Sequence, residues 1–239
     1  MPNSLLHALE LRDTLTADER KAVLRAASNE IDFKTGQDIV EEGERPNACS
    51  LVVSGLAARC IVLTGGGRQF TALHVPGDFV DLQSLLLKRM DHAVLALAPT
   101  RVARVAHAAL RQITVDFPHL ARLLWLMTLV DGAIHREWIL SLGRRQAPAR
   151  LAHLLCELFM RLQAVGKVDG LSFSLPLTQP QMGDMLGISA VHMNRTLQEL
   201  RREGLISWQG QAVTIKDWQH LKSLAEFDPA YLSLEKAPR

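Results

Sequence analysis

Residues 177–200, LTQPQMGDMLGISAVHMNRTLQEL, decide the fold of this chain. Apolar residues at helical spacing predict two short helices, one carrying Met182, Met185 and Leu186 and the next carrying Met193, Leu197 and Leu200. Between them, Gly187 can adopt the positive φ that ends a helix. Ser189 can accept hydrogen bonds from the first free amides of the second helix. The stretch therefore predicts two helices joined by a tight turn.

The second helix of this pair leaves one side open to contacts. Its open positions are Ala190, Val191, His192, Asn194, Arg195 and Gln198. Two helices at this spacing, with a glycine in the turn and polar residues leading the second helix, are typical of a helix-turn-helix. The second helix of that motif enters the major groove of DNA. An ordinary helical hairpin inside a core is the alternative that this pattern leaves open.

A basic helix end and two short β-rich runs follow the pair. Arg201 and Arg202 precede Gly204, and the runs LIS and AVTI flank Gln209 and Gly210. These runs predict a small hairpin, and a hairpin directly after a helix-turn-helix makes a winged helix. The wing adds phosphate contacts beside the groove, which favours DNA binding over the core hairpin.

The composition is that of a globular chain of 239 residues with a formal net charge of +2. Residues 1–143 hold 15 Lys and Arg against 16 Asp and Glu, whereas residues 144–239 hold 12 against 9, so the positive excess lies with the helix-turn-helix. No apolar run reaches the roughly 18 residues of a membrane span, and the N-terminus lacks the pattern of a secretory signal. Cys49, Cys60 and Cys156 are widely spaced, as expected of reduced thiols in a cytoplasmic protein.

The N-terminal half changes from helical to strand-rich patterning. Residues 4–28 predict one or two short helices, the second opened by a capping box from Thr16 to Glu19. Four β-rich runs follow, separated by glycine-bearing turns: IDFKTGQDIVEEGE, SLVVSGLAARCIVL, RQFTALHVPGDFV and AVLALAPTRVARVA. Many short strands at near-regular spacing predict a small antiparallel barrel or jelly roll. Near Ala108 the pattern becomes helical again.

Residues 118–143 predict one long helix that is apolar on more than one side. Its main stripe consists of Leu120, Leu124, Met127, Ile134 and Trp138. We expect this stripe to be a self-associating seam, with burial inside one domain as the alternative. A break at 143–147 precedes a further helix that has Pro148 in its first turn. The expected domain boundaries are 1–117, 118–143, 144–220 and 221–239, the last part being a helix and a loose tail.

A strand-rich barrel, a long helix, a short hinge and a winged helix, in that order, resemble the Crp/Fnr superfamily of bacterial transcription regulators. The resemblance covers nearly the whole chain, and its most specific pieces are GDFVDLQSLL, the helix pair from 118 to 155 and the stretch from 177 to 206. It implies an α+β fold with an N-terminal antiparallel β-roll, a dimerisation helix and a C-terminal winged helix-turn-helix. It also implies a cytoplasmic homodimer that reads palindromic double-stranded DNA, with half-sites about 34 Å apart, and that acts with RNA polymerase.

The resemblance assigns the sequence-reading contacts to residues 189–195. Arg195 occupies the position of an arginine that reads guanine, which is the commonest specific contact. Val191 replaces a glutamate common in the family and could touch a thymine methyl, so we expect the half-site to differ from the familiar one. Asn194 has a solvated or capping role as its alternative. The expected DNA-binding residues, the phosphate donors first, are Thr178, Gln179, Ser189, Val191, His192, Asn194 and Arg195.

The resemblance also implies a position for a cyclic-nucleotide pocket. The residues expected there are Asp81, Leu82, Gln83, Ser84, His92, His135 and Arg136. Leu82 replaces the glutamate that takes the ribose hydroxyl, no arginine stands at the phosphate position beside His92, and a Thr-Ser pair that contacts the purine is lost. These three changes argue against cyclic AMP as the effector in the usual way, although Arg89 lies close enough to substitute. The effector stays unidentified, and a pocket that binds nothing is an alternative.

The sequence contains few residue patterns that indicate a cofactor site or an enzymatic activity. An iron–sulfur cluster needs four thiolates, which three scattered cysteines cannot supply. No histidine spacing requires haem or another metal, so no cofactor or metal is expected. A cupin-like metalloenzyme needs a His-x-His motif, and His74-Val75-Pro76 is not one. We therefore expect a DNA-binding regulator and no enzyme, with a cyclic-nucleotide- or haem-binding sensor module as the alternative.

Overall fold

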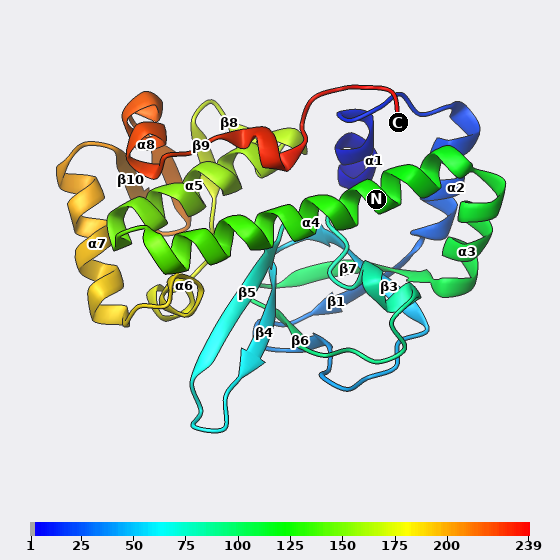
Figure 1. Ribbon diagram of the computed structural model, residues 1–239, viewed down its shortest axis with the longest axis horizontal. Coiled ribbons are helices and arrows are strands. Elements are labelled where there is room, and N and C mark those ends of the chain that lie inside the picture. The colour runs from blue at the N-terminus through cyan, green and yellow to red at the C-terminus, as the bar shows by residue number, and fades with distance from the viewer. Residues whose placement is uncertain (1–2) are drawn as a thin grey trace.

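A single long helix, α4 (Pro118–Arg144), lies across the middle of the molecule (Figure 1). The structure is a computed structural model that describes residues 3–239. In Figure 1 the strands β1 to β7 lie below α4, and the C-terminal elements gather around its left end. The N-terminal half consists of α1 (Asn3–Glu10), α2 (Ala17–Ala26), β1 (Asn29–Phe33), β2 (Asp38–Val40), β3 (Ala48–Ser54), β4 (Ala57–Val62), β5 (Arg68–His74), η1 (Leu82–Leu85), β6 (Ala93–Ala96), β7 (Thr100–Ala106) and α3 (His107–Asp116).

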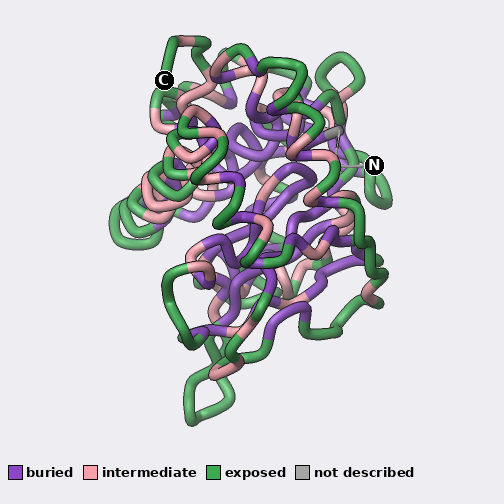
Figure 2. The backbone as a smooth tube through the Cα atoms, turned by 90° about the vertical axis from the view of Figure 1, so that its right-hand side faces the viewer, coloured by how far each residue is buried: buried purple, intermediate pink, exposed green. Residues whose placement is uncertain are grey.

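The strands pair into two antiparallel sheets, with the orders β1-β7-β3 and β2-β6-β4-β5. Ile31 lies opposite Val102 in the first sheet, and Ala58 lies opposite Leu95 in the second. Side chains from both sheets form one buried cluster, which includes Val40, Val52, Ala57, Val94 and Val102. This arrangement confirms the predicted jelly-roll-like domain. The hairpin between β4 and β5 projects from the body and is exposed along residues 61–68 (Figure 2).

The C-terminal half begins after a break of two residues at the predicted hinge. It consists of α5 (Ala147–Ala164), β8 (Val168–Asp169), β9 (Ser172–Ser174), α6 (Gln179–Leu186), α7 (Ala190–Arg202), β10 (Ile206–Gln209), β11 (Ala212–Ile215), α8 (Trp218–Ala225) and η2 (Pro229–Leu232). Its sheet has the order β10-β11-β9-β8, so the predicted wing hairpin gains two strands that the sequence did not predict. Those strands have two and three residues, too few to show an alternating pattern. Within residues 3–239, no helix is both long and apolar enough to cross a membrane.

The predicted stripe of α4 is buried within the chain, which corrects the expected seam. Leu120 packs beneath α1 and α2, and Ile134 and Trp138 pack with residues of β5 and α5. These three side chains are 1%, 6% and 7% exposed, and Leu124 and Met127 are half-buried against the cluster that holds Leu120. Much of the surface of α4 is therefore covered by its own chain. The side that stays open carries the apolar residues Trp125, Leu129, Ile139 and Leu140.

The C-terminal tail is ordered by contacts, which corrects the expectation of a loose end. It runs from α8 back over α4 to the turn after α1 (Figure 1). The Tyr231 hydroxyl donates to Glu157 Oε2 at 3.0 Å, and Leu232 is 1% exposed. The Ala237 amide donates to the carbonyl of Arg12 at 2.9 Å. The tail thereby ties the C-terminal half to the N-terminal helices.

Candidate nucleic-acid interface and sensor pocket

The turn between α6 and α7 is as tight as the sequence predicts. Gly187 has a φ of 64°, in the left-handed region, and Ser189 Oγ accepts from the His192 amide at 3.2 Å. A Cβ on Gly183 would lie only 2.6 Å from the carbonyl oxygen of Ile188, so glycine is required where the turn folds back on α6. The apolar residues predicted for the two helices are all buried: Met182, Met185, Leu186, Met193, Leu197 and Leu200.

The opposite face of α7 is open to solvent. Val191 is 71% exposed, and His192, Asn194 and Arg195 are exposed as well. Asn194 Nδ2 donates to Gln179 Oε1 at 3.2 Å and so joins α7 to the start of α6. Arg195 makes no hydrogen bond or ion pair with any of residues 3–239. Its guanidinium is thus free to meet an external partner.

The predicted phosphate donors lie at the beginnings of the two helices. Thr178 is the N-cap of α6: its hydroxyl accepts from the Gln181 amide at 3.3 Å and donates to Gln181 Oε1 at 3.0 Å. Ser189 caps α7 in the same way. Both residues are exposed, and Gln179 is half-buried. The free amides of a helix start attract phosphate, so these positions suit backbone contacts to DNA.

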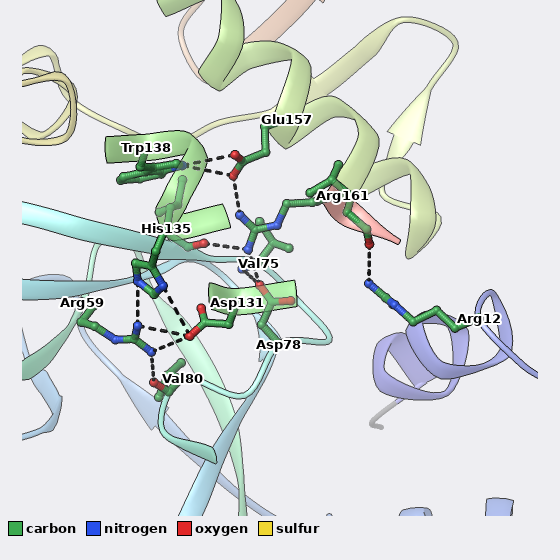
Figure 3. Close-up of polar contacts among 12 residues, drawn as sticks. Arg12, Arg59, Val75, Asp78, Val80, Asp131, His135, Trp138, Glu157 and Arg161 are labelled. Carbon is green, nitrogen blue, oxygen red and sulfur yellow. Dashed lines mark hydrogen bonds and ion pairs between the residues drawn. The ribbon is translucent and has the colours of Figure 1, made fainter. Parts of the chain in front are cut away.

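The winged helix rests on the β-roll through polar contacts of α6. Arg68 Nε, at the start of β5, donates to Asp184 Oδ2 at 2.8 Å, and Gln69 Nε2 donates to the carbonyl of Met185 at 3.2 Å. Deeper in the junction, Arg161 on α5 donates to Asp78 at 2.6 Å and to Glu157 at 2.8 Å (Figure 3). These contacts fix the orientation of the recognition helix relative to the roll.

His135, one of the residues predicted for a nucleotide pocket, belongs to a network of polar contacts within the chain. Arg59 on β4 is 8% exposed and donates to Asp131 on α4 at 3.3 Å and to the carbonyl of Val80 at 3.3 Å (Figure 3). It also donates to His135 Nε2 at 2.8 Å, because burial lowers the pKa of His135 and leaves the ring neutral. The sequence analysis missed Arg59 and Asp131. The available signals were an arginine inside an apolar strand and an aspartate one helical turn before His135.

The other predicted pocket residues are dispersed. Only Leu82 and Gln83 line the cavity between η1 and α4, whose volume is about 60 Å³, far below the roughly 300 Å³ of a typical ligand site. Ser84 lies within 3.0 Å of His107 Nε2, and Asp91 holds His92 Nδ1 at 2.7 Å. Arg136 is exposed and does not line this cavity.

Asp81 is fully buried, and we expect its carboxyl to make the folding stability of the protein depend on pH. Oδ1 accepts from the Ser50 amide at 2.5 Å, whereas Oδ2 has no partner among the described residues. Burial raises the pKa of Asp81 to about 7, against about 3.9 in an unfolded chain. Protonation of the Asp81 carboxyl therefore favours the folded state, and this contribution to stability is lost as the pH rises from about 4 through 7.

Asp81→Asn keeps an acceptor for Ser50 and removes the charge. We expect it to raise the melting temperature at pH 8 by several degrees, corresponding to up to about 4 kcal/mol. The difference from the wild type should widen between pH 4 and 7 and level off above pH 7. Thermal unfolding across this range measures it, and a difference that does not change with pH contradicts the assignment.

Both halves of the chain match known families. A model described as a cyclic nucleotide-binding domain matches residues 30–116, and one described as a Crp-like helix-turn-helix domain matches residues 149–224. The transcriptional activator protein FnrL of Cereibacter sphaeroides is 28% identical over 193 residues, covering 79% of this chain and 77% of its own length. The nitrogen fixation regulation protein FixK of Azorhizobium caulinodans is 26% identical over 219 residues, covering 90% of this chain and 88% of its own.

A solved structure extends this likeness to three dimensions. FixK2 from Bradyrhizobium japonicum aligns with a TM-score of 0.74 at 27% identity, covering 82% of this chain and 96% of its own. The matched domains follow one another in the order that the sequence predicts, and FnrL is a transcriptional activator. The chain belongs to the Crp/Fnr family of transcription regulators, with a cyclic-nucleotide-binding-type domain followed by a DNA-binding helix-turn-helix domain.

Proposed function

We propose that the protein is a homodimeric regulator that reads a palindromic operator with the exposed face of α7. The observation that carries this proposal is that Val191, His192, Asn194 and Arg195 lie exposed on one helix while its other face packs against α6 and the wing. A second copy related by two-fold symmetry places two such helices in successive major grooves, about 34 Å apart. The exposed apolar side of α4 supports this pairing. As a transcription regulator of this family, it would act with RNA polymerase.

We propose further that the protein reads DNA without cyclic AMP. Arg59, Asp131 and His135 already form hydrogen bonds or an ion pair with one another at the nucleotide position. The polar contacts of α6 with β5 hold the recognition helix while its reading face is open. The proposed units are a sensor roll at 1–117, a dimer helix at 118–143, a DNA-binding unit at 144–220 and a C-terminal helix and tail at 221–239.

Fluorescence anisotropy of the full chain on a selected palindromic DNA tests the proposal. We expect tight binding that weakens steeply with salt, with a specific affinity at least 10³-fold above that for unrelated DNA of equal length. Adding cyclic AMP should leave both affinities unchanged. Equal affinity for both DNAs contradicts sequence reading. A rise in operator affinity with cyclic AMP shows instead that the polar network opens to admit the nucleotide.

A further inference from the structure

The turn of the helix-turn-helix packs directly against the end of the long helix α4 (Figure 1). A Cβ on Gly187, in this turn, would lie 3.2 Å from Cδ2 of Leu142, in the last turn of α4. A small hollow of about 20 Å³ between the two helices is lined by Trp138 and Leu142 of α4 and by Met185 of α6. The DNA-binding unit is therefore in contact with the helix that carries the proposed dimer seam.

Arg150, in the first turn of α5, lies at this junction and donates to backbone carbonyls on both sides of it. Its Nη2 donates to the carbonyl of Leu142 at 3.2 Å and to that of Arg145 at 3.0 Å, at the C-terminal end of α4. Its Nη1 donates to the carbonyl of Leu186, the last residue of α6. One guanidinium thus joins the C-terminal ends of two helices.

The two helix ends are suitable partners for a cation. The last carbonyls of a helix have no donor within the helix, and they carry the negative end of the helix dipole. Arg150 forms no ion pair with a carboxylate among residues 3–239, so the helix ends are what its charge faces. The planar fork of a guanidinium can bond several such acceptors at once, which a lysine ammonium does less well.

The other polar contacts of α6 hold it to the β-roll and not to α4. Arg68 and Asp184 form an ion pair whose side chains are 37% and 27% exposed, and such pairs contribute little in water. Gln69 donates to the carbonyl of Met185 from β5. Arg150, in contrast, hydrogen-bonds both α4 and α6.

We propose that Arg150 is a positioning residue that fixes the recognition helix α7 relative to the dimer helix, and so selects the half-site spacing of the operator. This role rests on the proposed homodimer. Only residues 187–189 separate Leu186 from α7, so a contact that holds Leu186 also holds the end of α7 that enters the groove.

The two copies of the proposed dimer pair along α4, so the angle between α4 and α7 sets the distance between the two recognition helices. A dimer with a fixed angle accepts one separation of half-sites. A dimer in which Arg150 no longer joins the two helix ends accepts neighbouring separations at a smaller cost.

Fluorescence anisotropy on three palindromic DNAs tests this role: the selected operator, and two operators whose half-sites are one base pair closer or farther apart. The measured quantity is the ratio of the affinity for the selected operator to the affinity for each altered one. Because both affinities come from the same protein sample, a loss of folded protein cancels in the ratio. Arg150→Gln should lower this ratio about 3- to 30-fold, the combined effect of a cation at two helix C-termini. Arg150→Lys keeps the charge but reaches one helix end at a time, so it should lower the ratio about 2- to 5-fold.

Arg144→Gln is the matched control. Arg144 is the last residue of α4, is exposed, and makes no hydrogen bond or ion pair with residues 3–239. Its substitution should leave the ratio unchanged, whatever the loss of one positive charge does to the affinity for all three DNAs. If the wild type prefers one spacing and Arg150→Gln keeps the same ratio, Arg150 does not position α7. Should Arg150→Gln not fold, an Arg150→Lys ratio equal to that of Arg144→Gln contradicts the role in the same way. A wild type that binds all three DNAs equally contradicts the proposed homodimer, and the role of Arg150 with it.

Discussion

Arg195→Ala is expected to lower affinity for the operator about 5- to 150-fold, which corresponds to about 1–3 kcal/mol. The guanidinium is exposed on α7 and makes no contact within the described chain that would hold it away from DNA. Met193 and Leu197, on the opposite face, are buried and keep the helix in place when the arginine is removed. The loss is therefore one of binding, and the melting temperature of the variant should stay close to that of the wild type.

Substitution of a second arginine on the same helix serves as a control, which distinguishes a contact to a base from a general attraction to the charged phosphates. Arg202 is exposed in the last turn of α7, away from the end that leads into the groove. Arg202→Ala should weaken binding to all DNA sequences similarly and reduce the salt slope by about one. Arg195→Ala should instead lose discrimination at one base pair of each half-site, measured by anisotropy on single-base operator variants. If Arg195→Ala weakens every sequence equally, Arg195 contacts phosphate rather than a base.

The features that could be predicted from the sequence depend on contacts between near neighbours. The cap of Ser189 on the His192 amide spans three residues, as does the capping box between Thr16 and Glu19. Gly187 likewise predicts the end of α6, because its left-handed φ depends only on the local backbone. The order of roll, long helix and winged helix follows from such local patterns and from their periodicity.

The features that could not be predicted depend on contacts between distant residues. Arg59 donates a hydrogen bond to Asp131, which is 72 residues away in the sequence, and Arg12 donates to the carbonyl of Leu232, which is 220 residues away. Periodicity identifies α4 as apolar on several sides but cannot say which side the roll, α5 or the tail will cover. The tail itself has little apolar pattern, and contacts with distant residues such as Glu157 and Arg12 order it. The predicted seam was wrong for this reason.

The corrected seam predicts that Leu129→Glu combined with Ile139→Glu yields a folded monomer. In the protomer these side chains are 55% and 70% exposed, so two glutamates there cost the isolated chain little. Positions 125, 129, 132, 136 and 139 alternate steps of four and three along α4, the spacing of a two-helix seam. A charge desolvated against an apolar partner helix would disfavour pairing strongly. Light scattering should give half the wild-type mass, and affinity for the palindromic DNA should fall at least 100-fold because one copy cannot engage both half-sites.

Two control substitutions show whether the loss of the dimer is caused by the change at the seam. Val115 on α3 is 73% exposed and lies outside α4, so Val115→Glu adds a charge at an equally exposed apolar site and should leave the dimer intact. Ile134 lies on the buried side of α4, so Ile134→Glu should lower the melting temperature sharply whatever the oligomeric state. A Leu129→Glu, Ile139→Glu variant that keeps the wild-type mass would show that the open side of α4 is not the seam. Such a chain would have to pair through another surface. The next apolar surface to substitute is then the exposed hairpin between β4 and β5. Its residues Ile61, Val62 and Leu63 are 42%, 60% and 66% exposed.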